Sequence, residues 1–106
     1  MVDMIKIKDL SSRIAREFNP HRIILFGSHA YGHPDRDSDV DLLVILQFKG
    51  KPVRKAIEIR NRINPQIPVD IIVRTPEQVA KRIAENDFFL REVIEKGQTL
   101  YEASYE

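Results

Sequence analysis

The sequence contains no cysteine, so neither disulfide bonds nor thiolate chemistry can contribute to its stability or activity. A reducing interior suits such a chain, and we expect a cytoplasmic location. No apolar stretch approaches the ~20 residues that a membrane-spanning helix needs. The first residues also lack the basic start and long apolar core of a signal peptide. We therefore expect no membrane partner.

The chain also lacks a strong excess of either charge. It has 17 lysines and arginines against 16 aspartates and glutamates, a net charge of +1. Nucleic acid is therefore not expected as the main partner. Basic residues do gather at Arg54–Lys55, at Arg60 and Arg62, and at Lys81–Arg82. Such groups are usually solvated helix faces, and the alternative is a surface for an acidic partner or for RNA.

The pattern of apolar residues predicts an α/β chain. The length of 106 residues indicates a single domain covering residues 1–106. Short runs of branched apolar residues predict strands at 22–26, 40–46 and 67–73. Amphipathic spacing and Asn-Pro or Thr-Pro stop and start signals predict helices around these strands. We expect the order αβαβαβαα, a small mixed sheet flanked by helices.

A pair of carboxylates stands at the start of the second expected strand. Because side chains alternate along a strand, Asp39 and Asp41 should point to the same face. Neighbouring like charges repel each other, and burying them without compensation is costly. A divalent cation such as Mg²⁺ supplies that compensation, since it prefers carboxylate oxygens, water and phosphate. The pair therefore indicates a metal site.

A third carboxylate, Asp70, lies inside the apolar run of the third expected strand. An acid in such surroundings is rarely buried unless it is paired or binds a metal. On a strand beside Asp39 and Asp41, it would complete a site for two ions about 3.5–4 Å apart. Such a site activates an attacking hydroxyl and stabilises a leaving pyrophosphate.

A Gly-Ser pair follows the first expected strand. Gly27 lets the backbone approach a phosphate closely. Ser28, at the start of a short helix, would turn its hydroxyl and the exposed amides toward a triphosphate. Taken alone, the Gly-Ser pair could be an ordinary turn, and the aspartates could belong to a solvated loop or a calcium loop. The glycine and terminal glutamate of an EF-hand calcium loop are absent, however. Together and in this order, they favour a metal–nucleotide site.

The motif Gly27-Ser28-x10-Asp39-x-Asp41, followed by Asp70, resembles the minimal nucleotidyltransferases (MNT proteins, MntA-like antitoxins) of the DNA polymerase beta superfamily. The resemblance implies the polymerase beta palm-like nucleotidyltransferase fold. It implies transfer of a nucleoside monophosphate, often AMP from ATP, to a hydroxyl. Asp39, Asp41 and Asp70 would hold two Mg²⁺ ions and carry catalysis, while Gly27 and Ser28 would bind the nucleotide. It further implies a HEPN ribonuclease toxin as partner, silenced by modification of a tyrosine.

Two positions depart from this family pattern. Members often carry arginine one or three residues after the serine, where this chain has His29 and Tyr31. His29 is therefore a candidate phosphate contact. Arg36 and Arg74 are candidates for the positive charge that the pattern leads us to expect.

Two other functions stay open at this point. The chain could neutralise a toxin by binding alone, with a vestigial nucleotide site, although the intact acidic triad argues against such drift. It could also transfer a nucleotide to a small molecule such as an aminoglycoside, although a chain of 106 residues leaves little room for a built-in pocket.

Overall fold

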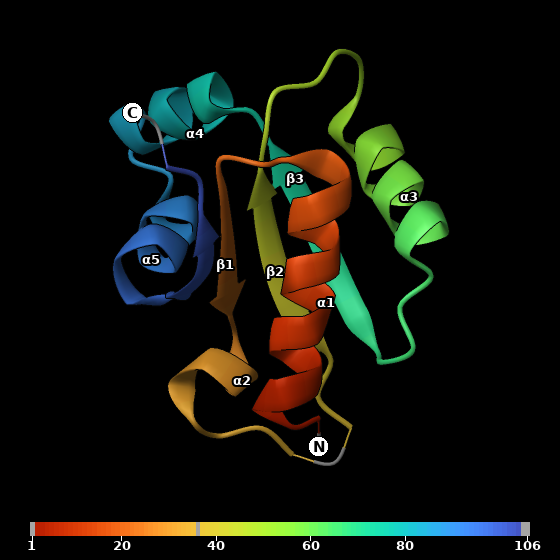
Figure 1. Ribbon diagram of the computed structural model, residues 1–106. Helices are drawn as coiled ribbons and strands as arrows, with labels where there is room; N and C mark the ends of the chain where they lie inside the picture. The colour runs from red at the N-terminus through yellow and green to blue at the C-terminus, as the bar shows by residue number, and fades with distance from the viewer. Residues whose placement is uncertain (1, 36, 105–106) are drawn as a thin grey trace.

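The computed structural model describes residues 2–35 and 37–104. The first eight elements follow the predicted order, and a ninth element, a strand that the sequence did not predict, comes after them (Figure 1). The elements are α1 (Met4–Phe18), β1 (Arg22–Phe26), α2 (Ser28–Tyr31), β2 (Val40–Ile45), α3 (Pro52–Ile63), β3 (Val69–Arg74), α4 (Pro76–Ala84), α5 (Phe88–Lys96) and β4 (Gln98–Glu102).

The four strands form one mixed sheet in the order β3-β2-β1-β4. β1 is antiparallel to both of its neighbours, while β2 and β3 are parallel. The expected small mixed sheet is therefore confirmed. β3 begins at Val69 rather than at Ile67, because Pro68 has no N–H to donate to a ladder. The carbonyl of Pro68 still accepts a hydrogen bond from the Val40 amide at 3.0 Å.

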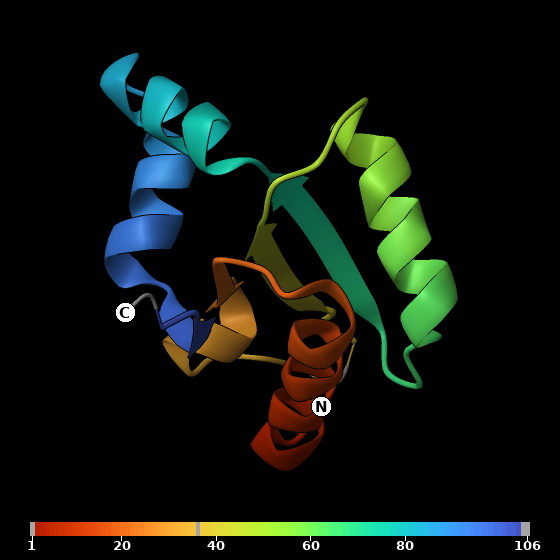
Figure 2. The same cartoon turned by 45° about the horizontal axis from the view of Figure 1, so that its top comes forward.

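Helices cover both faces of the sheet, so the molecule has three layers (Figures 1 and 2). One core lies between the sheet and helices α1 and α3, and a smaller core lies between the sheet and helices α4 and α5. The larger core contains Ile7 and Ile14 of α1 and Ile59 of α3. The smaller core contains Val79 of α4 and Leu90 of α5.

Local signals set the ends of the helices. Asn19 and Asn64 adopt the left-handed conformation and end α1 and α3, each just before a proline. Thr75 begins α4 through a capping box: its side chain accepts from the Gln78 amide, and the Gln78 side chain accepts from the Thr75 amide. The predicted start of this helix is therefore confirmed.

Gly97 joins α5 to β4 at a point of close packing. A Cβ atom at this position would lie 2.4 Å from the carbonyl oxygen of Val93 and 2.6 Å from Cγ2 of Ile24. The φ angle of Gly97 is −68°, so the need for glycine is steric and not conformational. The missing side chain lets the backbone pass against β1 and enter the sheet as its fourth strand.

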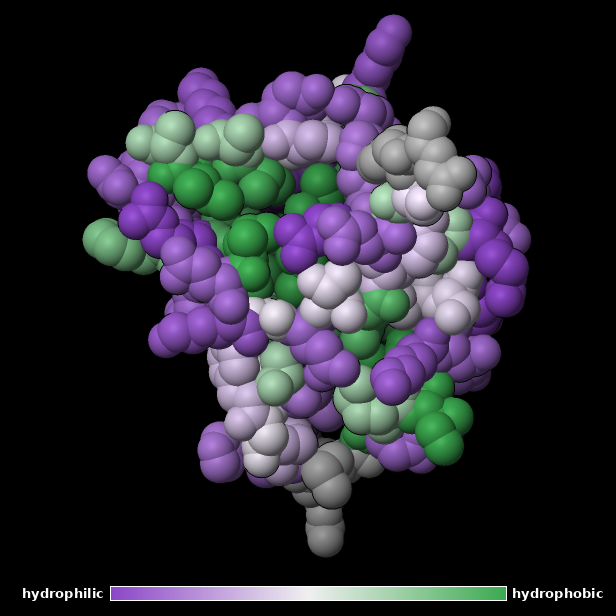
Figure 3. Space-filling model, turned by 60° about the vertical axis from the view of Figure 1, so that its left-hand side comes forward, coloured by the Kyte–Doolittle hydropathy of each residue, from purple (hydrophilic) through white to green (hydrophobic). Residues whose placement is uncertain are grey.

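Some apolar side chains remain on the surface. Figure 3 shows one face of the molecule, where hydrophobic side chains gather in a hollow bordered by hydrophilic ones. Over the described residues, the exposed large apolar side chains are Ile5, Tyr31, Val53, Ile57, Phe88 and Phe89. Phe89 contacts the buried Phe26 edge-on, with ring centroids 5.5 Å apart. Across the described ranges, none of the helices combines the length and apolarity that crossing a bilayer requires.

Candidate active site

Strand register brings two of the three predicted carboxylates side by side. Asp41 is the second residue of β2 and Asp70 is the second residue of β3, and they are direct partners in the parallel pairing. On its other side, Asp41 is paired with Phe26, the last residue of β1. The carboxylates therefore lie where the starts of β2 and β3 meet the end of β1.

The alternation of side chains shows which face they occupy. Leu43 and Ile45 of β2 belong to the core under α4 and α5, and Ile72 of β3 packs against that core. Because every second residue of a strand shares a face, Asp41 and Asp70 also lie on this side of the sheet. One face of the sheet thus has an apolar half, packed by helices, and an acidic half.

The structure corrects one expectation about these acids. Asp70 was expected to be buried among apolar neighbours, but its side chain is exposed. Over β2 and β3, the core under α4 and α5 contains only later residues, Leu43, Ile45 and Ile72, so the start of β3 is left open. Asp41 is half-buried, and Asp39, which precedes β2, is exposed. The site is therefore open to solvent on the sides of Asp39 and Asp70.

Gly27 is fitted closely to Asp41. A Cβ atom on Gly27 would lie 2.3 Å from Oδ2 and 3.2 Å from Cγ of the Asp41 side chain. The backbone of Gly27 has φ 76° and ψ −160°, a region that is essentially reserved for glycine. The sequence assigned Gly27 to phosphate approach, and it missed this contact with a carboxylate. Only the pairing of Phe26 with Asp41 brings the two together.

Ser28 opens the short helix α2, as expected from the sequence. Gly27 is the residue before it and accepts hydrogen bonds from the amides of Ala30 and Tyr31. The serine hydroxyl therefore lies one residue beyond the Gly27–Asp41 contact. Its predicted contact with a nucleotide stays a prediction.

The acids influence each other electrostatically. Burial raises the pKa of the Asp41 carboxyl, and the negative charges of Asp70 and then Asp39 raise it further. The positive charge of His29 opposes this rise in the pKa of Asp41. Three carboxylates and one histidine therefore lie within electrostatic reach of each other, and the negative charge is not fully compensated.

His29 is the residue that fills the family's frequent arginine position. Its Nδ1 atom lies 3.1 Å from the backbone carbonyl oxygen of Asp39, which ties α2 to the start of β2. Its Nε2 atom is buried and makes no hydrogen bond within residues 2–35 and 37–104. The predicted phosphate contact is not tested, but the ring does lie beside the acids.

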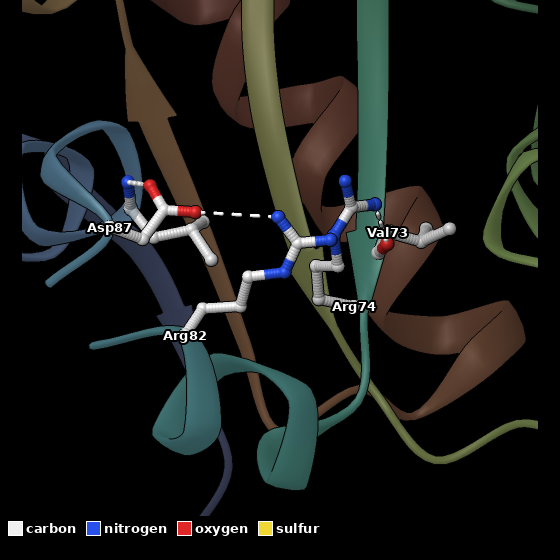
Figure 4. Close-up of polar contacts among 5 residues, drawn as sticks. Val73, Arg74, Arg82 and Asp87 are labelled. Atoms are coloured by element: carbon white, nitrogen blue, oxygen red, sulfur yellow. Dashed lines mark hydrogen bonds and ion pairs between the residues drawn. The ribbon is translucent and has the colours of Figure 1, made fainter. Parts of the chain in front are cut away.

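Arg74 is not brought to the acids. It is the last residue of β3, four residues after Asp70, which corresponds to about 13 Å along a strand. Its Nη1 donates to the carbonyl oxygen of Val73 at 2.7 Å, and its guanidinium lies near that of Arg82 (Figure 4). Arg36 falls outside the described residues. Of the candidates within the described residues, His29 and not Arg74 lies close enough to the acids to affect the pKa of Asp41.

The donor set fits Mg²⁺, which binds through one or two carboxylates and completes its coordination with water and substrate phosphates. Burial and then the negative charges of Asp70 and Asp39 raise the pKa of Asp41, and a divalent cation would relieve the repulsion between these carboxylates. Within the described part of the chain, no three histidine, cysteine or acidic side chains form a ready-made metal cage.

A family comparison agrees with this geometry. The model of the nucleotidyltransferase domain family matches residues 7–98, so this chain belongs to that family. The match includes all five predicted site residues, most of α1 and every element from β1 to α5. No curated protein sequence matches the chain.

Solved structures share the fold. A candidate nucleotidyltransferase from Sulfolobus solfataricus is 22% identical, with a TM-score of 0.63 over 92% of this chain and 78% of that chain. A toxin–antitoxin complex with AMP-PNP is 19% identical, with a TM-score of 0.59 over 92% of this chain and 74% of that chain. A variant of the MntA–HpeT toxin–antitoxin pair with two Asp-to-Glu substitutions is 17% identical, with a TM-score of 0.56 over the same shares. The nucleotidyltransferase fold is thus shared with antitoxin systems.

Proposed function

We propose that this nucleotidyltransferase moves AMP from ATP to a hydroxyl group of a partner protein. The acceptor is a tyrosine of a HEPN ribonuclease toxin, and the chain acts as the antitoxin in the cytoplasm. Membership of the nucleotidyltransferase family supports the reaction type. Fold neighbours taken from toxin–antitoxin complexes, one of them with AMP-PNP, support the nucleotide and the kind of partner.

One observation carries the proposal. Asp41 and Asp70 are register partners on adjacent parallel strands, and the Asp41 carboxylate fits against a glycine whose backbone no other residue readily adopts. A structural role does not explain this arrangement, because burial and then the neighbouring negative charges raise the pKa of Asp41 and oppose its ionisation. A site that binds cations and phosphates does explain it.

Each site residue has its own role in the proposed reaction. Gly27 and Ser28 bind the triphosphate, and Asp39, Asp41 and Asp70 hold Mg²⁺. When bound, Mg²⁺ neutralises charge on the phosphates. The acceptor oxygen attacks the α-phosphorus, and a new O–P bond forms as the bond to the pyrophosphate oxygen breaks. Asp70, exposed at the open side of the site, accepts the proton of the acceptor hydroxyl, and pyrophosphate leaves.

The test uses the protein encoded beside this chain in its genome. That protein is incubated with this chain, ATP and Mg²⁺, and the intact masses of both proteins are measured. We expect the neighbour to gain one or more AMP groups on tyrosine. Asp41→Asn should abolish the gain because it removes a charged ligand at the centre of the site. Asp37→Asn is the matched control, since Asp37 is exposed in the same acidic loop, outside β2.

Each outcome decides between functions. Transfer that persists in Asp41→Asn contradicts the assigned site. A stable complex without any mass gain favours an antitoxin that acts by binding alone. Absence of both complex and mass gain refutes the toxin partner, and transfer to a small molecule then becomes the leading function.

A further inference from the structure

A groove runs along the outer edge of β3, from the residue after Asp70 to the end of the strand. It has a volume of about 690 Å³ and lies between α3 and α4. Ile71 and Ile72 both line it although they point to opposite faces of the sheet. The groove therefore follows the edge of the strand and does not lie over one face.

The outward backbone of β3 is partly open along this groove. The carbonyls of Pro68 and Arg74 accept hydrogen bonds from β2 and its continuation, so the alternate residues Val69, Ile71 and Val73 turn their backbone groups outward. The outer carbonyls of Val69 and Val73 accept hydrogen bonds from guanidinium groups, of Arg60 and Arg74 respectively. Over residues 2–35 and 37–104, no strand pairs with this edge.

The wall on the α3 side is apolar. Val53 and Ala56 line the groove, and Val53 is 63% exposed. Ile57, one residue further along the helix, is 53% exposed. Ala56 also packs against the core that contains Ile59 and Ile63, whereas Val53 and Ile57 lie one turn apart on an exposed face of the helix. α3 thus carries a second apolar stripe that the fold leaves uncovered.

The rim of the groove is basic. Lys51 stands before α3, Arg74 ends β3, and Lys81 and Arg82 lie on α4. Glu85 is the one acid among the described lining residues. Arg82 pairs with Asp87 at 3.5 Å in an exposed contact, and Asp87 lies outside the groove lining (Figure 4). Burial and then the charge of Arg82 lower the pKa of Arg74, as expected of two crowded cations.

The position of the groove matches what an acceptor needs. Gly27 and Ser28 lie at the β1 side of the carboxylates, so a nucleotide bound there occupies that side. The acceptor then has to approach from the β3 side, where Asp70 is exposed. The groove begins on the same strand directly after Asp70.

We propose that the groove along the β3 edge binds an extended, acidic segment of the acceptor protein and so delivers its hydroxyl to Asp70. The outward backbone groups that Arg60 and Arg74 leave unoccupied, such as those of Ile71, offer hydrogen bonds. The α3 stripe takes apolar side chains, and the four basic residues take carboxylates. An RNA strand fits less well, because its phosphates and sugars would make no favourable contact with the apolar wall or the strand edge. The chain as a whole also carries a net charge of only +1. This inference rests on the proposed function for the identity of the acceptor alone.

Binding is tested on the full chain without nucleotide or metal. Fluorescein-labelled peptides that alternate Glu with Val, or Lys with Val, and a single-stranded RNA of equal length are titrated by fluorescence anisotropy. We expect the Glu-Val peptide to bind most tightly. Lys81→Glu on the α4 wall and Lys51→Glu on the α3 wall should each weaken it about fivefold. Lys8→Glu, the same change at an exposed position of α1, should alter it by less than about twofold.

Amide NMR shifts locate the bound peptide. We expect the shifts to gather in β3, α3 and α4. Shifts centred elsewhere, equal losses in all three variants, or tighter binding of the RNA through Lys81 would overturn the proposal. Thermal unfolding of each variant checks that the fold is intact.

Kinetics with the acceptor separate this inference from the proposed function. Once the wild-type chain is shown to modify the neighbouring protein, Lys81→Glu should raise the KM for that protein about fivefold, with kcat and the KM for ATP unchanged. An unchanged KM for the acceptor refutes the docking groove and leaves the transferase function standing. Failure of the wild-type chain to modify the neighbour refutes the proposed function, while the peptide and NMR results still decide the groove.

Discussion

Replacement of Gly27 by alanine tests whether the backbone of this residue positions the Asp41 carboxylate. Two effects are combined at this position. The backbone angles of φ 76° and ψ −160° are strained for any residue with a Cβ atom, at a cost of about 1–3 kcal/mol. The new Cβ atom would also lie 2.3 Å from Oδ2 of Asp41, well inside contact distance.

The overlap of the new Cβ atom with Oδ2 of Asp41 should weaken Mg·ATP binding more than it lowers the stability of the fold. Oδ2 is the end of a short side chain, so the carboxylate can swing away from the new methyl group. That movement relieves the overlap, but it takes a proposed Mg²⁺ ligand out of position. Displacement of residues that support metal ligands typically costs 10–100-fold in metal affinity, and we expect at least about tenfold weaker binding of Mg·ATP.

Gly50 provides the matched control. It also has a positive φ angle, of 88°, but a Cβ atom there would meet nothing within 4 Å. Gly50→Ala should therefore lower the free energy of unfolding by about 1 kcal/mol and leave Mg·ATP binding unchanged. Urea unfolding measures the first quantity and isothermal titration calorimetry the second. Equal Mg·ATP affinities in Gly27→Ala and Gly50→Ala would refute the positioning role of Gly27.

Two further predictions concern stability. Burial and the charges of Asp70 and Asp39 raise the pKa of Asp41, so the folded protein retains this proton to a higher pH than the unfolded chain does. The metal-free protein should therefore lose stability as the pH rises from the unfolded to the folded pKa of this group. Asp41→Asn should then be more stable than the wild type at pH 7 in EDTA, and urea unfolding should show the gain vanish below about pH 4; a gain that is independent of pH contradicts the charge argument. Thr75→Ala removes the hydroxyl that caps α4 and should cost about 1 kcal/mol in urea unfolding, whereas Thr75→Ser should restore most of it; equal losses in both variants would mean that the methyl group, and not the cap, stabilises the helix.

Much of the fold could be predicted because its elements carry local signals. The strands β1, β2 and β3 are short runs of branched apolar residues, and the ends of α1, α3 and α4 have caps that act within a few residues. β4 carries no such signal. Its sequence, Gln98–Glu102, is largely polar and its side chains are exposed or half-buried, as suits an edge strand. Its pairing with β1 depends on the close passage at Gly97, which is a tertiary contact.

In the candidate site too, some features follow from local sequence patterns and others depend on tertiary contacts. Side-chain alternation predicts that Asp39 and Asp41 share a face, and the parallel register sets Asp70 beside Asp41. The exposure of Asp70 depends on how much of the sheet α4 and α5 cover, and no pattern within residues 67–73 contains that information. The contact of Gly27 with Asp41 likewise depends on the antiparallel pairing of β1 with β2.

The open acidic half of the sheet bears on how a transferase of this size avoids simple hydrolysis of its nucleotide. Water can reach Asp70 and Asp39 freely, because both side chains are exposed. A lid that excludes water is one solution to this problem, but the helices of this face are packed on its apolar half. An acceptor docked along the β3 edge is another, since it would cover Asp70 and supply the attacking hydroxyl at the same time. The acceptor would then complete the active site. While it is bound, its hydroxyl takes the place of water as the attacking group, so that transfer is favoured over hydrolysis.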